Sequence, residues 1–319
     1  MPKPFSEAIK EKFPVTYEIP SPKGVQWQKH IENFNKLEIK KYIDAINVPY
    51  NPTARLRIDP SPYSAKVMEL TDVDVIPHLT CKGNNILNLQ SWLFGIYIQN
   101  IKNVLVLTGD LPMVGDYPTE PGAESINSIE LITGIKKYLS TGYMMPELAT
   151  RPMRMRNRYE KKIDTIDSKI DFTVGAVIVP GRSKEVMYVR EKIRAGTDFF
   201  QTQIVYTPEE IINLIEEIEY YMPDSKIPVL VGTAPVRSKK SAVYIMERVL
   251  NNNIDKKVKK KLMESDNIKR VSMEICVSLY EDLKDGMKER GLHTPVGAHV
   301  MALRSSKMAA EIIRRIKHI

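Results

Sequence analysis

The stretch VLVLTGDLP, residues 104–112, places four apolar residues in a row before a Thr-Gly step and Asp110. An apolar run without polar alternation is typical of a strand that is covered on both faces, as in a parallel sheet. Asp110 would then stand at the carboxyl end of a buried strand, where α/β proteins place their chemistry. Because Gly and Asp are also ordinary turn residues, the stretch alone fits a simple strand-ending turn equally well.

Further apolar runs resemble this one, and helical patterns separate them. The strand-like runs are 14–19, 42–48, 73–80, 103–109, 171–179, 198–206, 227–232 and 295–303, and the predicted helices are 30–41, 84–99, 124–140, 183–195, 207–221, 238–250 and 305–317. This alternation predicts an α/β protein, a (β/α)8 TIM barrel that forms a single domain over residues 1–319, with an N-terminal extension at 1–12. A doubly wound open sheet is the alternative, but no GxGxxG follows the first strand.

Three segments are too long or too rich in proline to be simple connections. Residues 49–65 contain four prolines and cannot form one helix, so we expect a long loop after the second strand. Residues 111–123 and 141–170 are extended insertions as well. Long loops on one side of a barrel usually carry function, so we expect these to cover the barrel mouth.

The composition narrows the class of protein. The net charge is +8, but the basic clusters at 151–162 and 255–261 are not interleaved with aromatic residues as a nucleic-acid surface would be. We interpret them as solvated surface, with the first cluster able to attract an anionic substrate tail. The charged start and the lack of a long apolar run predict a cytoplasmic protein without a membrane partner. Cys81 and Cys276 fit no zinc pattern, so we expect no metal site.

Polar residues recur at the carboxyl ends of the predicted strands. They are Glu18, Asn47, His78, Thr80, Asp110, Gln203 and His299. In a barrel these positions converge on one mouth. Each residue alone has a structural explanation, such as a cap or a hydrogen-bonded core side chain, but together they favour a catalytic mouth over chance.

The segments around these residues resemble a known family, the methylenetetrahydrofolate reductases. They are TYEIPSP (16–22), DAINVPYNPTARLR (44–57), PHLTCKGNN (77–85), LQSWLFG (89–95), NVLVLTGDLPMVGDYP (103–118), TVGAVIVP (173–180) and KIRAGTDFFQTQIVY (192–206). The resemblance covers roughly residues 14–304 and is strongest to the branch found in acetogenic bacteria and archaea. It implies a flavin-dependent barrel that uses NADH or NADPH to reduce 5,10-methylenetetrahydrofolate to the 5-methyl form.

The resemblance also implies roles for individual residues. Glu18 would be the general acid that opens the five-membered ring of the substrate, and Asp110 would lie between the flavin and the pterin. Gln203 would bind the pterin edge through its amide, and Asn47 and Gln90 are further substrate-pocket candidates.

The cofactor site follows from the same motifs. His78, Thr80, Leu107, Thr108 and Gly109 would line the flavin together with Asp110. Lys192 would reach the flavin phosphate or ribose, and a helix that starts near Ser183 would offer backbone donors to that phosphate. Gly175 and Ala176 would keep the end of the fifth strand slim enough for a ring system to approach.

Departures from the enteric type of the family leave alternatives open. Val179, Ser183 and Glu191 stand where those enzymes contact the adenylate, so FMN is an alternative to FAD. Lys239 stands near the aromatic residue that stacks nicotinamide or folate, so the reductant could come through a partner subunit. The carbon carrier could be tetrahydrofolate or a modified tetrahydropterin, and a homo-oligomer remains open. Two other functions compete: a pterin-binding methyltransferase or partner-dependent subunit without hydride chemistry, and a basic nucleic-acid-binding protein.

Overall fold

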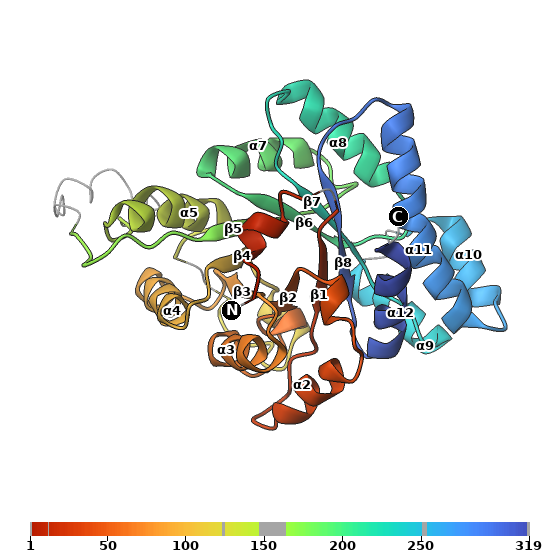
Figure 1. Ribbon diagram of the computed structural model, residues 1–319, viewed down its shortest axis with the longest axis horizontal. Helices are drawn as coiled ribbons and strands as arrows, with labels where there is room; N and C mark the ends of the chain where they lie inside the picture. The colour runs from red at the N-terminus through yellow and green to blue at the C-terminus, as the bar shows by residue number, and fades with distance from the viewer. Residues whose placement is uncertain (1, 12, 123–124, 147–163, 251–253, 318–319) are drawn as a thin grey trace.

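The computed structural model describes the chain except residues 1, 12, 123–124, 147–163, 251–253 and 318–319. Eight parallel strands pair in chain order and close into a barrel, with the helices outside it (Figure 1). The strands are β1 Val15–Glu18, β2 Ala45–Val48, β3 Val75–Thr80, β4 Asn103–Leu107, β5 Thr173–Ile178, β6 Phe199–Ile204, β7 Val229–Thr233 and β8 Val296–Met301. The predicted (β/α)8 TIM barrel is confirmed, and each strand falls inside the run that predicted it except β7, which extends one residue further, to Thr233.

Helices that were expected from the sequence surround the barrel. They are α2 Gln28–Asn35, α4 Ile86–Ile98, α5 Ser128–Thr133, α7 Glu185–Ala195, α8 Glu209–Tyr221, α9 Lys239–Tyr244 and α12 Ser306–Ile316. Helix α5 continues into the π-helical turn η4 Gly134–Tyr138 and the 3-10 turn η5 Leu139–Thr141, and α9 continues into the π-helical turn η6 Ile245–Val249. The helix predicted over 30–41 stops early because Glu38 takes a left-handed conformation, and a 3-10 turn, η1 Lys40–Tyr42, follows.

Four helices of the described chain were not predicted from the sequence: α1 Phe5–Ala8, α3 Pro60–Thr71, α10 Lys256–Glu264 and α11 Ile268–Glu289. Two prolines lie in the first turn of α3, where a missing N–H costs nothing, and the Asp59 carboxylate accepts a hydrogen bond from the Ser61 N–H at 2.7 Å. The loop expected over 49–65 therefore ends at Asp59. In α10 a run of lysines obscures two buried apolar residues, Val258 and Leu262.

The N-terminal segment closes the barrel at the amino ends of its strands. Helix α1, Phe5–Ala8, is the red segment that lies against the strands in Figure 1. The Phe5 and Phe199 rings meet edge to face at 5.2 Å, and the Asp74 carboxylate accepts hydrogen bonds from the Phe5 N–H at 2.8 Å and from Asn103 Nδ2 at 2.9 Å. One apolar cluster fills this end: Phe5, Ala8, Ile9, Ala45, Ile76, Leu105, Phe199 and Leu230. A ligand must therefore enter from the opposite end.

Gly175 belongs to this packing. A Cβ added at Gly175 would lie 2.2 Å from an atom of the Phe199 ring. The glycine therefore makes room for a core aromatic ring, which replaces our expectation that it leaves space for a ligand. Its neighbour Ala176 is fully buried in the main hydrophobic core.

We expect Gly175→Ala to lower the free energy of unfolding by about 1–3 kcal/mol, because the new methyl group overpacks the Phe199 ring. Adding Phe199→Leu should recover part of that loss. Gly95→Ala is the matched control: it lies inside α4, the nearest atom to its new Cβ is Ser61 Oγ at 3.9 Å, and it should be neutral or stabilising by up to about 1 kcal/mol. Urea denaturation checks all three, and equal effects at the two glycines would contradict this packing.

Candidate active site

A cavity of about 1060 Å³ opens at the carboxyl ends of the strands. Its walls come from the ends of β1, β3, β4 and β5 and from the loops that follow β2 and β4. The predicted site residues that line it are Glu18, His78, Thr80, Leu107, Thr108, Gly109, Asp110 and Lys192. Residues that are far apart in the sequence therefore meet in one cavity at the barrel mouth.

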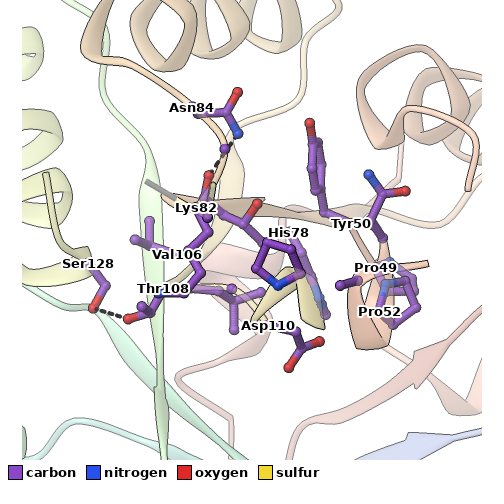
Figure 2. Close-up of a pocket in the computed structure, with 18 of the residues that line it drawn as sticks. Pro49, Tyr50, Pro52, His78, Lys82, Asn84, Val106, Thr108, Asp110 and Ser128 are labelled. Atoms are coloured by element: carbon purple, nitrogen blue, oxygen red, sulfur yellow. Dashed lines mark hydrogen bonds between the residues drawn. The ribbon is translucent and has the colours of Figure 1, made fainter. Parts of the chain in front are cut away.

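The close-up of this cavity shows two facing walls (Figure 2). Pro49, Tyr50 and Pro52 stand on one side, and Thr108 with Ser128 stands on the other, where the Thr108 hydroxyl lies 3.4 Å from the Ser128 hydroxyl. Gly109 follows Thr108 on the second wall, and its backbone is left-handed, with a φ of +96°. A Cβ at Gly109 would lie 3.1 Å from Thr80 Cβ, so glycine lets the ends of β3 and β4 approach closely.

Asp110 holds the loop that follows β2. The Thr53 N–H donates to Asp110 Oδ2 at 2.7 Å, although Thr53 takes a left-handed conformation with a φ of +58°. A second pair of contacts joins the same two loops: the Leu56 N–H donates to Asp116 Oδ2 at 3.0 Å, and the Asp116 N–H donates to the Ala54 carbonyl at 3.1 Å. We call residues 51–56 and 110–116 together the two-loop clasp. The clasp borders the cavity with two long loops that were both expected at the barrel mouth.

We expect Asp116→Ala to loosen the two-loop clasp, because the Leu56 N–H loses its acceptor. Trypsin should then cut after Arg55 and Arg57 at least about threefold faster than in the unmodified protein, since proteolysis reports local opening. Asp224→Ala, in the turn after α8, is the control and should leave the cutting rate unchanged. Mass spectrometry of the early fragments identifies the cut sites, and unchanged cleavage in Asp116→Ala would contradict the clasp.

A row of hydrogen-bonded polar side chains crosses the barrel beneath the cavity. His78 Nε2 lies 3.0 Å from Asn47 Oδ1, Asn47 Nδ2 lies 3.4 Å from His299 Nδ1, and Thr16 Oγ1 lies 2.9 Å from His299 Nδ1. We call these four residues the polar row. All four are buried, and burial lowers the pKa of His78 to about 4, so its imidazole is neutral at neutral pH.

Glu18 connects the polar row to the cavity. Its side chain is 16% exposed and lines the cavity, and Glu18 Oε2 lies 3.7 Å from His299 Nε2. Asn47, which we expected in the substrate pocket, instead lies below the cavity, where it holds the ring of His78. Asn47 would therefore affect ligand binding indirectly, by orienting the His78 ring.

The low pKa of His78 makes the stability of the fold depend on pH. The unfolded chain binds a proton at His78 below about pH 6.5, whereas the folded protein keeps this ring neutral down to about pH 4. The unfolded state therefore binds more protons in this window, and stability falls as the pH falls.

We expect His78 to account for a loss of about 3 kcal/mol between pH 6.5 and pH 4, a loss that His78→Gln removes. The measurement is urea unfolding of both proteins across this range, with His293→Gln, at an exposed position, as the control. If His78→Gln keeps the full pH slope of the unmodified protein, the neutral buried state of His78 is wrong.

The cationic side chains gather on the cavity wall near β5 and on the loops. They are Arg55, Lys82, Arg182 and Lys192. Lys192 Nζ donates to the Val177 carbonyl at 2.5 Å, and burial lowers the pKa of this lysine. Helix α7 begins at Glu185 rather than near Ser183, and the Glu185 carboxylate pairs with Arg182 and accepts from the Val179 N–H at 3.1 Å. A phosphate in the cavity would therefore contact the side chains of Lys192 and Arg182 rather than the N-terminal backbone of α7.

Other predicted site residues lie away from the cavity. Gln90 Oε1 accepts from the Met145 N–H at 2.7 Å, so this side chain positions the segment after α5. Gln203 is partly exposed near the carboxyl end of β6, and neither it nor Gly175 or Ala176 belongs to the cavity wall as described. Two residues before Gln203, Gln201 is buried, and its Oε1 has no hydrogen-bond partner among the described residues.

Sequence reasoning missed several residues of the wall, although the motifs that it used contain or flank them. Tyr50 and Arg55 lie in DAINVPYNPTARLR, and Lys82 and Asn84 lie in PHLTCKGNN. Their positions within these motifs could have identified them as wall residues, whereas Ser128, on α5, lies outside the motifs. The basic cluster at 151–162 lies outside the described residues.

The described part of the chain contains neither a cluster of metal ligands nor a helix that could span a membrane. Over those residues, three or more His, Cys, Asp or Glu side chains do not come together as a metal ion would require. Within the same residues, the helices are all too short or too polar to cross a membrane.

A closed parallel barrel with acidic, basic and imidazole side chains in a cavity at its mouth defines a TIM-barrel protein of the enzyme type. The chain belongs to the methylenetetrahydrofolate reductase family, whose model matches residues 5–317.

Two similar proteins show how far this chain has diverged from known sequences and structures. Methylenetetrahydrofolate reductase 2 of Schizosaccharomyces pombe is 24% identical over 273 residues, which cover 82% of this chain and 39% of the yeast protein. The chain thus spans about two fifths of the length of that relative. An uncharacterised protein from Clostridium thermocellum, which binds two copies of 5-methyl-5,6,7,8-tetrahydrofolic acid, matches with a TM-score of 0.67 and 16% identity over 99% of both chains. At this identity the likeness shows the fold.

Proposed function

We propose that this protein is a flavin-dependent reductase that converts 5,10-methylenetetrahydrofolate, or a related methylene-tetrahydropterin, to the 5-methyl form with NADH or NADPH. The observation that carries the proposal is the cavity in which Glu18, His78 and Asp110 meet cationic side chains at the barrel mouth. Family membership supports the reaction, and the folate bound by the Clostridium thermocellum protein supports the substrate class.

The residues of the cavity fit a flavin. Gly109 lets the ends of β3 and β4 approach closely at the cavity wall, and the hydroxyls of Thr80 and Thr108 offer hydrogen bonds to a polar ring edge. Lys192 and Arg182 suit a phosphate. The flavin, when bound, would supply hydride transfer. We propose FAD as the cofactor and FMN as the alternative, because Val179, Ser183 and Glu191 depart from the family's adenylate contacts.

Glu18 is the proposed general acid. Opening the five-membered ring of the substrate breaks a C–N bond, and the nitrogen that leaves needs a proton. A carboxyl group at the edge of a covered cavity suits this task, and Glu18 lies there. Asp110 engages the Thr53 N–H through Oδ2, and we propose that its carboxylate also accepts a hydrogen bond from the pterin. Gln203, at the end of β6, would bind the pterin edge.

The visible spectrum of the purified protein tests the flavin directly. We expect flavin absorption that bleaches with NADH or NADPH under anaerobic conditions and recovers when methylenetetrahydrofolate or a methylene-tetrahydropterin is added. A colourless protein that takes up neither FAD nor FMN would overturn the proposal. If that colourless protein still bound 5-methyltetrahydrofolate, the methyltransferase or partner-dependent subunit would replace the reductase.

Glu18→Gln should separate the two half-reactions. Reduction of the flavin by the nicotinamide should stay within about twofold, whereas reoxidation by the methylene-pterin should slow by about 100-fold or more, the usual scale for a lost general acid. Stopped-flow absorbance measures both rates. Glu69→Gln, on the exposed side of α3, is the control and should change neither. An equal fall in both half-reactions would show that Glu18 is not the acid.

A further inference from the structure

The hydrogen bonds of the polar row determine which nitrogen of His299 carries the proton. Neutral His78 donates its Nε2–H to Asn47 Oδ1 at 3.0 Å, so the amide of Asn47 turns its Nδ2 donor toward His299 Nδ1. The Thr16 hydroxyl lies 2.9 Å from the same nitrogen and also donates to the Ala298 carbonyl at 3.4 Å. With the Asn47 amide donor directed at it, we take His299 Nδ1 as an acceptor, and the neutral ring then carries its proton on Nε2.

The other side of the His299 ring lacks a partner. His299 Nε2 is buried and has no hydrogen-bond partner among the described residues. Glu18 Oε2, at 3.7 Å, is just beyond hydrogen-bond length. A buried N–H that stays unpaired costs free energy, and a small rotation of the Glu18 side chain would satisfy it. The polar row therefore directs one donor at the carboxyl group that borders the cavity.

The groups around this pair are neutral near pH 7. From β3, His78 faces both partners, and burial holds its pKa near 4. Tyr17, next to Glu18 on β1, has a pKa that burial raises to about 12. Tyr280, from α11, is buried with a raised pKa and donates its hydroxyl to the Val231 carbonyl at 2.8 Å. The charge state of the site therefore depends on Glu18 and His299 themselves.

We propose that His299 is a positioning residue for Glu18: its Nε2–H donates to the Glu18 carboxylate, orients that group toward the cavity and stabilises it once it has lost its proton. The inference rests on the proposed reductase function. In that step the O–H bond of Glu18 breaks, an N–H bond forms on the departing nitrogen, and the electron pair of the C–N bond goes to that nitrogen. Glu18 is left as a carboxylate that His299 stabilises, and solvent reprotonates it through the cavity.

NMR of protein labelled with ¹⁵N-histidine tests the contact without requiring activity. The chain has five histidines, so single substitutions can assign the signals. We expect His299 to carry its proton on Nε2, and Glu18→Gln to move the ¹⁵Nε2 signal of His299, because the Nε2–H loses its carboxylate acceptor. Proton occupancy on Nδ1, or a ¹⁵Nε2 signal of His299 that Glu18→Gln leaves unchanged, would overturn the proposal.

Two substitutions separate positioning from folding. His299→Gln places an amide N–H near the former Nε2, whereas His299→Asn reaches only the Thr16 and Asn47 side of the ring. We expect the Asn variant to slow reoxidation by the methylene-pterin about tenfold more than the Gln variant does, the scale of one charge-assisted hydrogen bond. Flavin reduction should be unchanged in both. Thermal denaturation checks that both variants fold.

The pH profile of the same half-reaction gives the sign of the effect. A hydrogen-bond donor to a carboxylate favours its ionised form, so losing the donor in His299→Asn should move the basic limb of the profile to higher pH, and His299→Gln should restore it. Variants that slow both half-reactions equally, with no shift of the limb, would reduce His299 to a structural residue. If the protein carries no reductase activity while the NMR coupling is present, the function fails and the His299–Glu18 contact stands.

Discussion

The hydrogen-bonded row Thr16–His299–Asn47–His78 is the constraint on which the site depends. It lies in the barrel interior, where water is scarce and each buried polar group needs a protein partner. The register of the strands provides those partners, because Thr16 pairs with His299 and Glu18 pairs with Asn47 across neighbouring strands. The row holds the His78 ring and lies beneath Glu18. The strand register of the closed barrel therefore determines where these two side chains lie at the cavity.

Carboxylates tie distant segments to both ends of the barrel. At the amino ends of the strands, Asp74 accepts the Phe5 N–H, and α1 closes the interior with apolar side chains. At the carboxyl ends, Asp110 accepts the Thr53 N–H, and the two-loop clasp borders the cavity. The closed end excludes water from beneath the polar row, and the open end leaves one entrance. Asp110 therefore acts on both the loop and the cavity, which links the position of the clasp to whatever the cavity binds.

The barrel could be predicted because apolar runs without alternation indicate strands that are covered on both faces, and strand ends then place Glu18, His78 and Asp110 together. Local composition misled where context decides the structure: prolines begin α3 rather than prevent it, and the lysines of α10 obscure its buried face. Gly175 shows a limit of a different kind, because a glycine beside a ligand and a glycine beside a core ring look alike in a sequence. The partners of His299, Asn47 and Gln90 are distant in the chain, so only the folded structure assigns them.

The central claim is that the cavity and the polar row form one site, in which Glu18 delivers a proton to the substrate. A crystal structure with bound flavin and 5-methyltetrahydrofolate tests it most directly. We expect the Glu18 carboxyl to lie within about 3 Å of the nitrogen that accepts the proton, or to reach it through one water molecule, with the flavin ring against the ends of β3, β4 and β5. A folate that binds away from Glu18, or a flavin that binds outside this cavity, would contradict it.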